Sequence, residues 1–189
     1  MATSKEKRDK HFPNWSLDNP IRRLFGNSKQ FNSYVKDGQV VADLGCGPGF
    51  YTLALADSVG LEGKVYAVDS NEKCIQSLEK KMEKGEYQNI ETHASSASDL
   101  SFINDRTVDF VLANGLFCSM APQYHEAAVG ELQRILKPNG QAYISVAKGF
   151  ISYVDQAKWE FILEGFNVEQ RNDGFPIIGD RWAVVSSKK

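Results

Sequence analysis

The chain has 189 residues, a net charge of -2 and a hydrophobic fraction of 42%, so we expect one domain that buries its own core. The mildly acidic balance argues against broad electrostatic capture of nucleic acid, and no nucleic-acid partner is expected. The three cysteines form no CxxC pair, and no apolar run approaches the roughly 20 residues that span a bilayer. These features predict a cytoplasmic protein without a membrane partner.

Residues 1–37 are interpreted as an N-terminal tail and cap, and residues 38–189 as the core of a single domain. The basic residues of the tail, Lys10 among them, are interpreted as solvated. Pro20 suits a helix start, and Ile21, Leu24 and Phe25 would share one face of that helix. The cap is therefore expected to be helical.

From residue 40 onward, short apolar runs alternate with segments of helical spacing. Glycines follow several predicted helices, Asn71 is placed to cap one, and Lys137-Pro138-Asn139-Gly140 predicts a turn. The predicted strands cover residues 40–44, 65–68, 90–93, 108–113, 142–147, 166–170 and 182–186. The predicted helices cover residues 50–59, 71–84, 124–136 and 156–164.

This alternation predicts a mostly parallel sheet with helices on both faces. Parallel strands are buried on both faces, which explains apolar runs in place of alternating patterns. The last two strands have only a loop between them, which implies one antiparallel strand. The predicted fold is α/β, a Rossmann-like doubly wound, mostly parallel seven-stranded sheet with one antiparallel strand and an N-terminal helical cap.

The first predicted strand ends as Asp43-Leu44-Gly45-Cys46-Gly47-Pro48-Gly49, directly before a helix. Ligands of such sheets bind at the carboxyl ends of the strands, where glycines let the backbone approach them closely. A dinucleotide loop needs a small residue at position 50, but the chain has Phe50, whose ring would obstruct close packing of helix on strand. A nicotinamide-dependent oxidoreductase is therefore the less favoured alternative.

The Asp43–Gly49 segment resembles motif I of the class I S-adenosylmethionine-dependent methyltransferases of the small-molecule type, and the resemblance extends over residues 38–147. It implies a methyltransferase enzyme with S-adenosylmethionine as its cofactor. The methionine end would be held by Asp43 and by the backbone of the glycine loop, that is Gly45, Cys46, Gly47 and Gly49.

Asp69 closes the second predicted strand and returns to the same sheet edge as the glycine loop. A carboxylate there accepts both ribose hydroxyls in dinucleotide and methyltransferase sites alike, and helix capping is the alternative role. By the resemblance, Ser70, Ser96 and Ala97 flank the adenine. Ser96 stands where the family commonly has an Asp on the adenine amino group, so that contact lacks a charge here. Asp99, three residues later, is interpreted as a turn cap.

Asn114 follows the fourth predicted strand and resembles a cofactor contact near the methyl donor. The sequence from Asn114 to Phe117 lacks the two prolines that nucleic-acid amino-methyltransferases carry here, so we expect a small-molecule acceptor. Cys118 would be a nucleophile or a pocket thiol, but no His is visibly placed to activate it. The catalytic residues are unknown, since packing roles are favoured for each candidate base: His11, Tyr34, Tyr51, His93, His125 and Tyr153.

Two further functions stay open. One is a methyltransferase-like binding or partner subunit that does not catalyse, and the other is a protein or RNA methyltransferase that recognises its target through the cap. Arg22 and Arg23 suit a solvated helix face better than a ligand contact, and Phe150 would line an acceptor pocket. The sequence shows no cluster of metal ligands, so no metal is expected, and it fixes neither the acceptor nor the oligomeric state.

Overall fold

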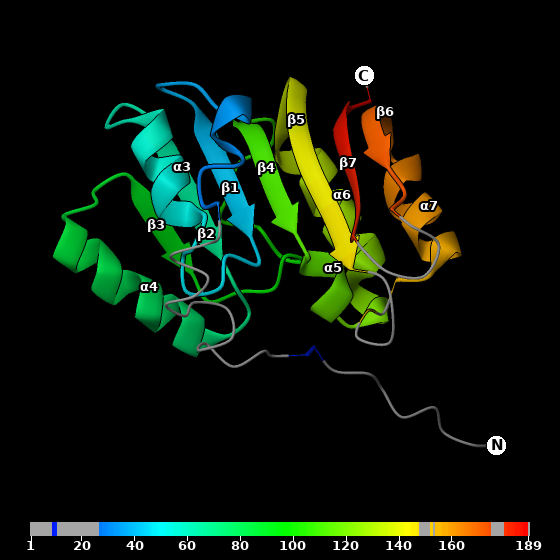
Figure 1. Ribbon diagram of the computed structural model, residues 1–189, viewed down its shortest axis with the longest axis horizontal. Helices are drawn as coiled ribbons and strands as arrows, with labels where there is room; N and C mark the ends of the chain where they lie inside the picture. The colour runs from blue at the N-terminus through cyan, green and yellow to red at the C-terminus, as the bar shows by residue number, and fades with distance from the viewer. Residues whose placement is uncertain (1–8, 11–26, 148–151, 153, 175–179, 189) are drawn as a thin grey trace.

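The computed structural model describes residues 9–10, 27–147, 152, 154–174 and 180–188. One sheet holds seven strands in the order β3-β2-β1-β4-β5-β7-β6 (Figure 1). Strand β7 runs antiparallel to β5 and β6, whereas the other neighbours pair in parallel, so the predicted doubly wound sheet is confirmed. The strands are β1 (Val40–Leu44), β2 (Lys64–Val68), β3 (Ile90–His93), β4 (Val108–Asn114), β5 (Leu136–Ala147), β6 (Phe166–Asn172) and β7 (Asp180–Ser187).

Helices cover both faces of the sheet (Figure 1). On one face lie α3 (Thr52–Val59) and α4 (Glu72–Gly85), and on the other lie α6 (His125–Ile135) and α7 (Gln156–Glu164). The short α5 (Leu116–Ser119) follows β4, and two 3-10 turns are η1 (Asn32–Tyr34) and η2 (Pro122–Tyr124). Within the described residues, none of the helices is long and apolar enough to cross a membrane.

The expected N-terminal cap lies mostly outside the described residues. Pro20, Ile21, Leu24 and Phe25, on which the helix prediction rests, are among the residues outside this range. From residue 27 to residue 37, the structure shows the 3-10 turn η1 in place of a longer helix. The prediction of a helical cap therefore stays a prediction.

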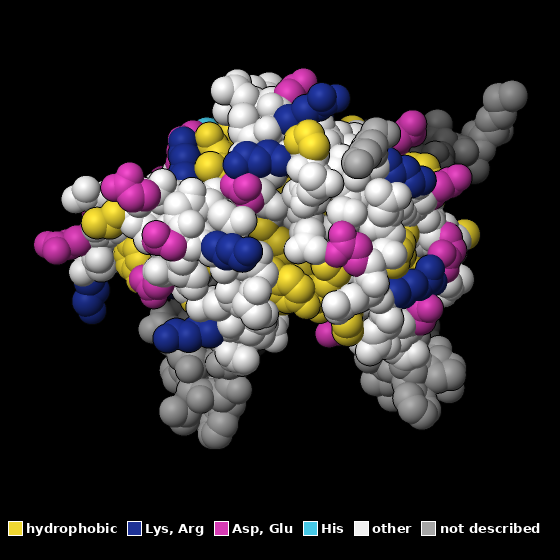
Figure 2. Space-filling model, turned by 90° about the horizontal axis from the view of Figure 1, so that it is seen from above, with side chains coloured by type: hydrophobic (Ala, Val, Ile, Leu, Met, Phe, Trp, Pro, Cys, Tyr) yellow, Lys and Arg dark blue, Asp and Glu magenta, His cyan; other side chains and the backbone are white. Residues whose placement is uncertain are grey.

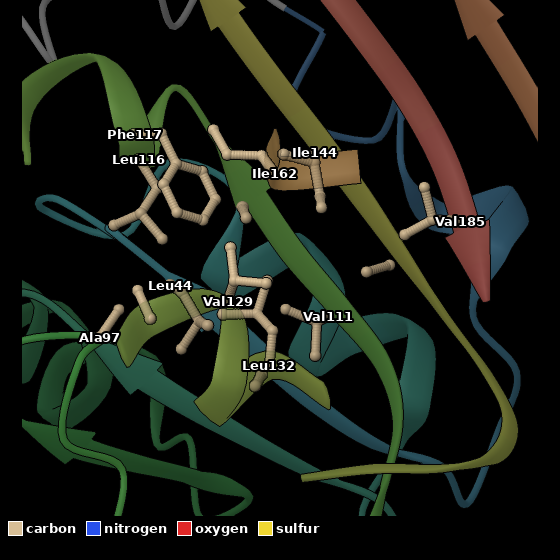
Figure 3. Packing of buried hydrophobic residues seen from close by; sticks show 14 of the residues in the cluster. Leu44, Ala97, Val111, Leu116, Phe117, Val129, Leu132, Ile144, Ile162 and Val185 are labelled. Carbon is tan, nitrogen blue, oxygen red and sulfur yellow. The ribbon is translucent and has the colours of Figure 1, made fainter. Parts of the chain in front are cut away.

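The sheet separates two apolar clusters, because successive side chains of a strand point to opposite faces. In β1, Val41 packs in the cluster that contains residues of α3 and α4, whereas Leu44 packs in the cluster that contains residues of α6 and α7. Figure 3 shows the second cluster, in which Val129 and Leu132 of α6 lie against Leu44 and Val111. Burial on both faces accounts for the apolar strands that the sequence displays.

One local prediction is wrong, and one short helix was not predicted. The Lys137–Gly140 segment, predicted as a turn, lies inside β5 as an irregularity, and the pairing of β5 with β4 shifts register between Val108 and Phe110. Asn139 takes a left-handed φ of 68° there, which asparagine adopts more readily than most residues. Helix α5 was not predicted, because four residues are too few to show a helical period.

The face at the amino ends of the parallel strands carries acidic and basic side chains side by side (Figure 2). Lys and Arg do not gather there into a patch of one sign on the described surface. A phosphate backbone is captured by a continuous basic surface, and this face does not offer one.

Asn71 begins α4 as predicted, because its side chain accepts a hydrogen bond from the backbone N–H of Lys73 at 3.1 Å. Replacing Asn71 by Ala leaves that N–H without its capping partner and should lower the free energy of unfolding by about 1 kcal/mol. Urea denaturation measures this loss, and Asn71→Ser, which can still cap, should recover most of it. An Asn71→Ala protein as stable as the parent would contradict the capping role.

Candidate functional site

The loop after β1 has a backbone path that requires its glycines. Gly45, Gly47 and Gly49 have φ values of 78°, 55° and 87°, a region in which other residues are strained. A Cβ added at Gly49 would also lie 2.4 Å from Cδ1 of Leu78 in α4. The loop therefore packs so closely against α4 that a side chain at position 49 would require Leu78 to move.

Asp69 holds this loop in place from the end of β2. Its Oδ2 accepts a hydrogen bond from the Gly47 N–H at 2.8 Å, and its Oδ1 accepts one from the Asn71 N–H at 2.8 Å. The carboxylate thus joins the glycine loop to the start of α4. The N-cap of α4 is Asn71, so Asp69 holds the capping residue and does not itself cap the helix.

A pocket of about 280 Å³ opens at the carboxyl ends of the parallel strands. One end is formed by segments that follow β2 and β3, and the other by segments around α5 and the end of β5. Six of the predicted cofactor-binding residues line it together: Gly45, Asp69, Ser70, Ser96, Ala97 and Asn114. The structure therefore brings residues from distant parts of the chain to one concave site.

The other four predicted residues do not line this pocket: Asp43, Cys46, Gly47 and Gly49. Gly47 gives its N–H to Asp69, and the buried Cys46 thiol donates to the carbonyl of Gly47 at 3.4 Å. Their places support the shape of the glycine loop. Direct contact of these residues with a cofactor stays a prediction.

Asp43 is a buried carboxyl group, with 3% of its surface exposed. Its Oδ2 accepts a hydrogen bond from the Thr52 hydroxyl at 2.7 Å. Burial raises the pKa of Asp43 from 3.8 to about 7, while the Thr52 hydrogen bond opposes this shift and the charge of Asp69 adds to it. Near neutral pH the side chain is therefore divided between its neutral and ionised forms.

The pocket end near β3 is lined by neutral polar groups. The Ser96 hydroxyl lies 2.8 Å from that of Ser98 and accepts a hydrogen bond from the Ser98 N–H at 3.2 Å. Cys74 lies at this end too, and burial raises the pKa of its thiol to about 12, so it stays neutral. Asp99 caps a turn as predicted, because its Oδ1 accepts from the Ser101 N–H at 3.2 Å.

At the opposite end, β5 orients the residues that follow β4. Ser145 donates its hydroxyl hydrogen to Asn114 Oδ1 at 2.6 Å and accepts from the Gly115 N–H at 3.1 Å. The Cys118 sulfur accepts from the Ala147 N–H at 2.9 Å, and burial raises the pKa of this thiol. The role of Ser145 could not be predicted from the sequence, because its partners lie about 30 residues away along the chain.

Residues 9 and 10 also line the pocket, which corrects the interpretation of Lys10 as part of a solvated tail. Asp9 Oδ1 accepts a hydrogen bond from the Ala121 N–H at 2.7 Å, and the Lys10 N–H donates to the Ser119 carbonyl at 2.8 Å. The end of α5 and the short loop after it therefore hold residues 9 and 10 against the pocket. No hydrophobic period marks such a contact in the sequence.

The described candidates for a general base do not line the pocket. His125 is buried, its Nε2 lies 3.1 Å from the Met120 carbonyl, and burial lowers its pKa. Tyr34 stacks on Phe110, and the Tyr51 hydroxyl accepts from the Gln30 side chain at 3.1 Å.

His93 stacks on Phe102 and its ring nitrogen lies 2.6 Å from Glu91 Oε1, so it also has a packing role. His11, Arg22, Arg23, Phe150 and Tyr153 lie outside the described residues. Among the residues that the structure describes, no group of three His, Cys, Asp or Glu side chains is placed to hold a metal ion.

Comparison with known proteins decides the family. The sequence profile of the methyltransferase domain matches residues 41–140, which is more than half of the chain. The chain belongs to the methyltransferase domain family. This confirms the resemblance to class I methyltransferases, and S-adenosylmethionine is the cofactor of the domain.

A methyltransferase domain of the same fold is found in solved structures. The S-adenosylmethionine-dependent methyltransferase of Aquifex aeolicus is 28% identical, with a TM-score of 0.68 over 91% of this chain and 96% of that one. A protein of Pyrococcus horikoshii, 19% identical, has a TM-score of 0.75 over 94% of this chain and 96% of that one. The second likeness concerns the fold alone.

Curated relatives of this methyltransferase domain include demethylmenaquinone methyltransferases. That of Bacillus velezensis is 34% identical over 107 residues, which cover 57% of this chain and 45% of the relative. That of Bacillus pumilus is 30% identical over 150 residues, which cover 74% of this chain and 63% of the relative. The matched part thus spans about half to two thirds of these relatives.

Proposed function

We propose that the protein transfers the methyl group of S-adenosylmethionine to a small-molecule acceptor. The observation that carries this proposal is the pocket itself, which Asp69, Ser96 and Asn114 line from the ends of three different strands. The relatives' name states a small-molecule acceptor, demethylmenaquinone, and this supports the acceptor class. Because the matched region covers only part of these relatives, their acceptor is a candidate to test first.

The polar groups that line the pocket fit the cofactor. In the proposal, Asp69 accepts the ribose hydroxyls, while Ser70, Ser96 and the Ala97 N–H border the adenine. Gly45 and Asn114 border the methionine end, and Asp43 stabilises its ammonium group from behind the glycine loop. Ser145 donates to Oδ1 of Asn114, and in the proposal the amide N–H₂ group of Asn114 donates to the methionine end of the cofactor.

The bound cofactor supplies a methyl group already activated on a sulfonium. The chain's task is therefore to align the acceptor in line with that methyl and to exclude water. Cys118, Ser119 and Met120 line the end of the pocket where the acceptor would lie. Since burial raises the pKa of Cys118, its thiol stays neutral near pH 7 and shapes the pocket instead of attacking a substrate.

Calorimetric titration with S-adenosylmethionine and S-adenosylhomocysteine tests the cofactor, with a nicotinamide dinucleotide as negative control. We expect saturable binding of the first two compounds and none of the third. Methyl transfer from labelled cofactor is then measured on a panel of small acceptors that includes a demethylated quinol. A folded protein that binds neither sulfur compound would refute the proposal.

The panel also separates the alternatives. Cofactor binding without turnover on any small acceptor, followed by labelling of a cell-extract protein or RNA, would favour a macromolecular acceptor. Binding without turnover on extracts as well would favour a partner subunit that does not catalyse. Turnover on a quinol would extend the activity named for the relatives to this chain.

A further inference from the structure

The loop that connects β3 to β4, residues 94–107, carries one end of the pocket but contains no helix or strand. Ser95, Ser96 and Ala97 of this loop line the pocket, and the side chains of Leu100 and Ile103 are fully buried. A buried loop needs hydrogen-bond partners for its own N–H and C=O groups. Part of that need is met by α6.

Glu131 and Arg134 of α6 bind the backbone N–H and C=O groups of Leu100. Glu131 Oε2 accepts from the Leu100 N–H at 2.6 Å, and Arg134 Nη2 donates to the Leu100 carbonyl at 2.8 Å. Arg134 Nη1 donates to the Ile103 carbonyl at 2.8 Å and to Asp105 Oδ1 at 2.6 Å. Nε and Nη2 bind Glu131 at 2.8 and 2.9 Å, so all five guanidinium N–H groups are used.

The residues just before Leu100 form a closed turn that lines the pocket. The Asp99 N–H donates to the Ser96 carbonyl at 3.0 Å, and the Ser95 hydroxyl donates to the Asp99 carbonyl at 3.1 Å. Ala97 packs in the core near Leu44, as Figure 3 shows. Any displacement of Leu100 therefore moves the turn that holds Ser95, Ser96 and Ala97.

We propose that the Glu131–Arg134 pair positions the base-binding end of the cofactor pocket, acting through Leu100. Neither side chain lines the pocket, so both are positioning residues and not catalytic ones. This inference rests on the proposed cofactor site. It gives the pair a role in cofactor affinity that a surface ion pair, which contributes little to stability, would not have.

The pair is suited to this role by its environment. The side chains of Arg134 and Glu131 are 27% and 19% exposed, so solvent screens their interaction less than that of a fully exposed pair. The Arg134 guanidinium lowers the pKa of Glu131, which keeps the carboxylate ionised near neutral pH. The planar guanidinium reaches two carbonyls and two carboxylates at fixed angles, which a lysine ammonium cannot do.

Two ligands separate a positioning role from a general structural one. S-ribosylhomocysteine matches S-adenosylhomocysteine except that a hydroxyl replaces the base, so the ratio of the two Kd values measures the contribution of the base. We expect Arg134→Gln to weaken S-adenosylhomocysteine binding about ten-fold while it changes S-ribosylhomocysteine binding by less than about two-fold. Calorimetry on the full chain provides both constants.

Arg171→Gln is the matched control. Arg171 also pairs with two carboxylates, those of Glu160 and Asp173, but at the β6 edge of the sheet and away from the pocket lining. The Arg171→Gln substitution should leave the ratio of the two Kd values unchanged. Arg134→Lys, which keeps the positive charge but lacks the planar guanidinium, should give an intermediate ratio of the two Kd values.

Equal weakening of both ligands by Arg134→Gln would overturn the positioning role, and so would the same change of ratio in Arg171→Gln. If Arg134→Gln does not fold, Glu131→Gln takes its place, because its amide oxygen can still accept from the Leu100 N–H while the ion pair is lost. Wild-type protein that binds neither ligand would instead overturn the proposed cofactor site, and the positioning role with it.

Discussion

Asp69→Asn should weaken the binding of S-adenosylhomocysteine by about 100-fold or more. The carboxylate accepts two backbone hydrogen bonds, from Gly47 and Asn71, and in the proposed site it also accepts the ribose hydroxyls. Hydrogen bonds to an ionised group contribute about 1.5–3 kcal/mol each, and an amide has one acceptor oxygen in place of two. The loss thus combines a weaker ribose contact with a glycine loop that is held less firmly.

Asp109→Asn provides the control for this experiment. Asp109 Oδ2 accepts from the Val40 N–H at 2.9 Å and its carboxylate pairs with Lys137 at 2.8 Å, but it does not line the pocket. We expect Asp109→Asn to lower the free energy of unfolding and to leave the affinity for S-adenosylhomocysteine unchanged. An Asp69→Asn protein that binds within about three-fold of the wild type would show that the carboxylate is structural only.

Most of the fold follows from short-range patterns in the sequence. Strand β1 is a run of mainly apolar residues followed by glycines, and the side chains of Asn71 and Asp155 cap the starts of α4 and α7. Asn71 caps α4 as expected, and Gly60 ends α3 with a φ of 67°. These features depend on neighbours in the chain, and such neighbours can be read without a structure.

Two local departures from the sequence patterns have different physical origins. Pro138 and Gly140 are typical turn residues, but pairing with β4 absorbs the segment into β5. At the C-terminus of α4, Glu86 takes the left-handed conformation, with φ 55°. Glycine adopts that conformation more readily, and Gly85 is the residue just before it. In β5 a tertiary contact overrides local preference, whereas at Glu86 the bonds are local: the N–H groups of Glu86 and Tyr87 donate to carbonyls of the last turn of α4.

The site was predictable in its parts and not in its arrangement. Gly45, Asp69 and Asn114 follow strand ends, and this is why the sequence could place them at one edge of the sheet. The sequence could not show that Asp69 binds the backbone of the glycine loop. Nor could it show the contacts of Arg134, whose hydrogen-bond partners in the β3–β4 loop lie about 30 residues away.

Asp43→Asn should stabilise the protein at pH 8 by up to about 4 kcal/mol and have little effect near pH 4. The pKa of Asp43 is raised from 3.8 to about 7 in the folded chain, because burial disfavours the ionised form. Folding therefore costs most above pH 7, where the buried carboxyl must be ionised, and the cost vanishes below the unfolded pKa. Asn is neutral at every pH and can keep the hydrogen bond with Thr52.

Urea denaturation of both proteins from pH 4 to pH 8.5 measures this difference, which should grow as the pH rises to 7 and then level off. Thr52→Val is the opposite control, because it removes the hydrogen bond that lowers the pKa of Asp43. In a Thr52→Val background the difference should therefore begin at the same pH, continue to grow to a higher pH and level off at a larger value. A difference between wild type and Asp43→Asn that does not vary with pH would contradict the raised pKa.

The same carboxyl links stability to cofactor binding. If the ionised form stabilises the ammonium of the methionine end, wild-type affinity for S-adenosylhomocysteine should rise with pH up to about 7, by as much as ten-fold per unit. Asp43→Asn should abolish that rise and bind more weakly than the wild type at pH 8. If the affinity of the Asp43→Asn variant still rises with pH as in the wild type, Asp43 supports the glycine loop without interacting with the ligand. If that rise of affinity with pH is absent in the variant, the chain retains a destabilising buried charge because cofactor binding requires it.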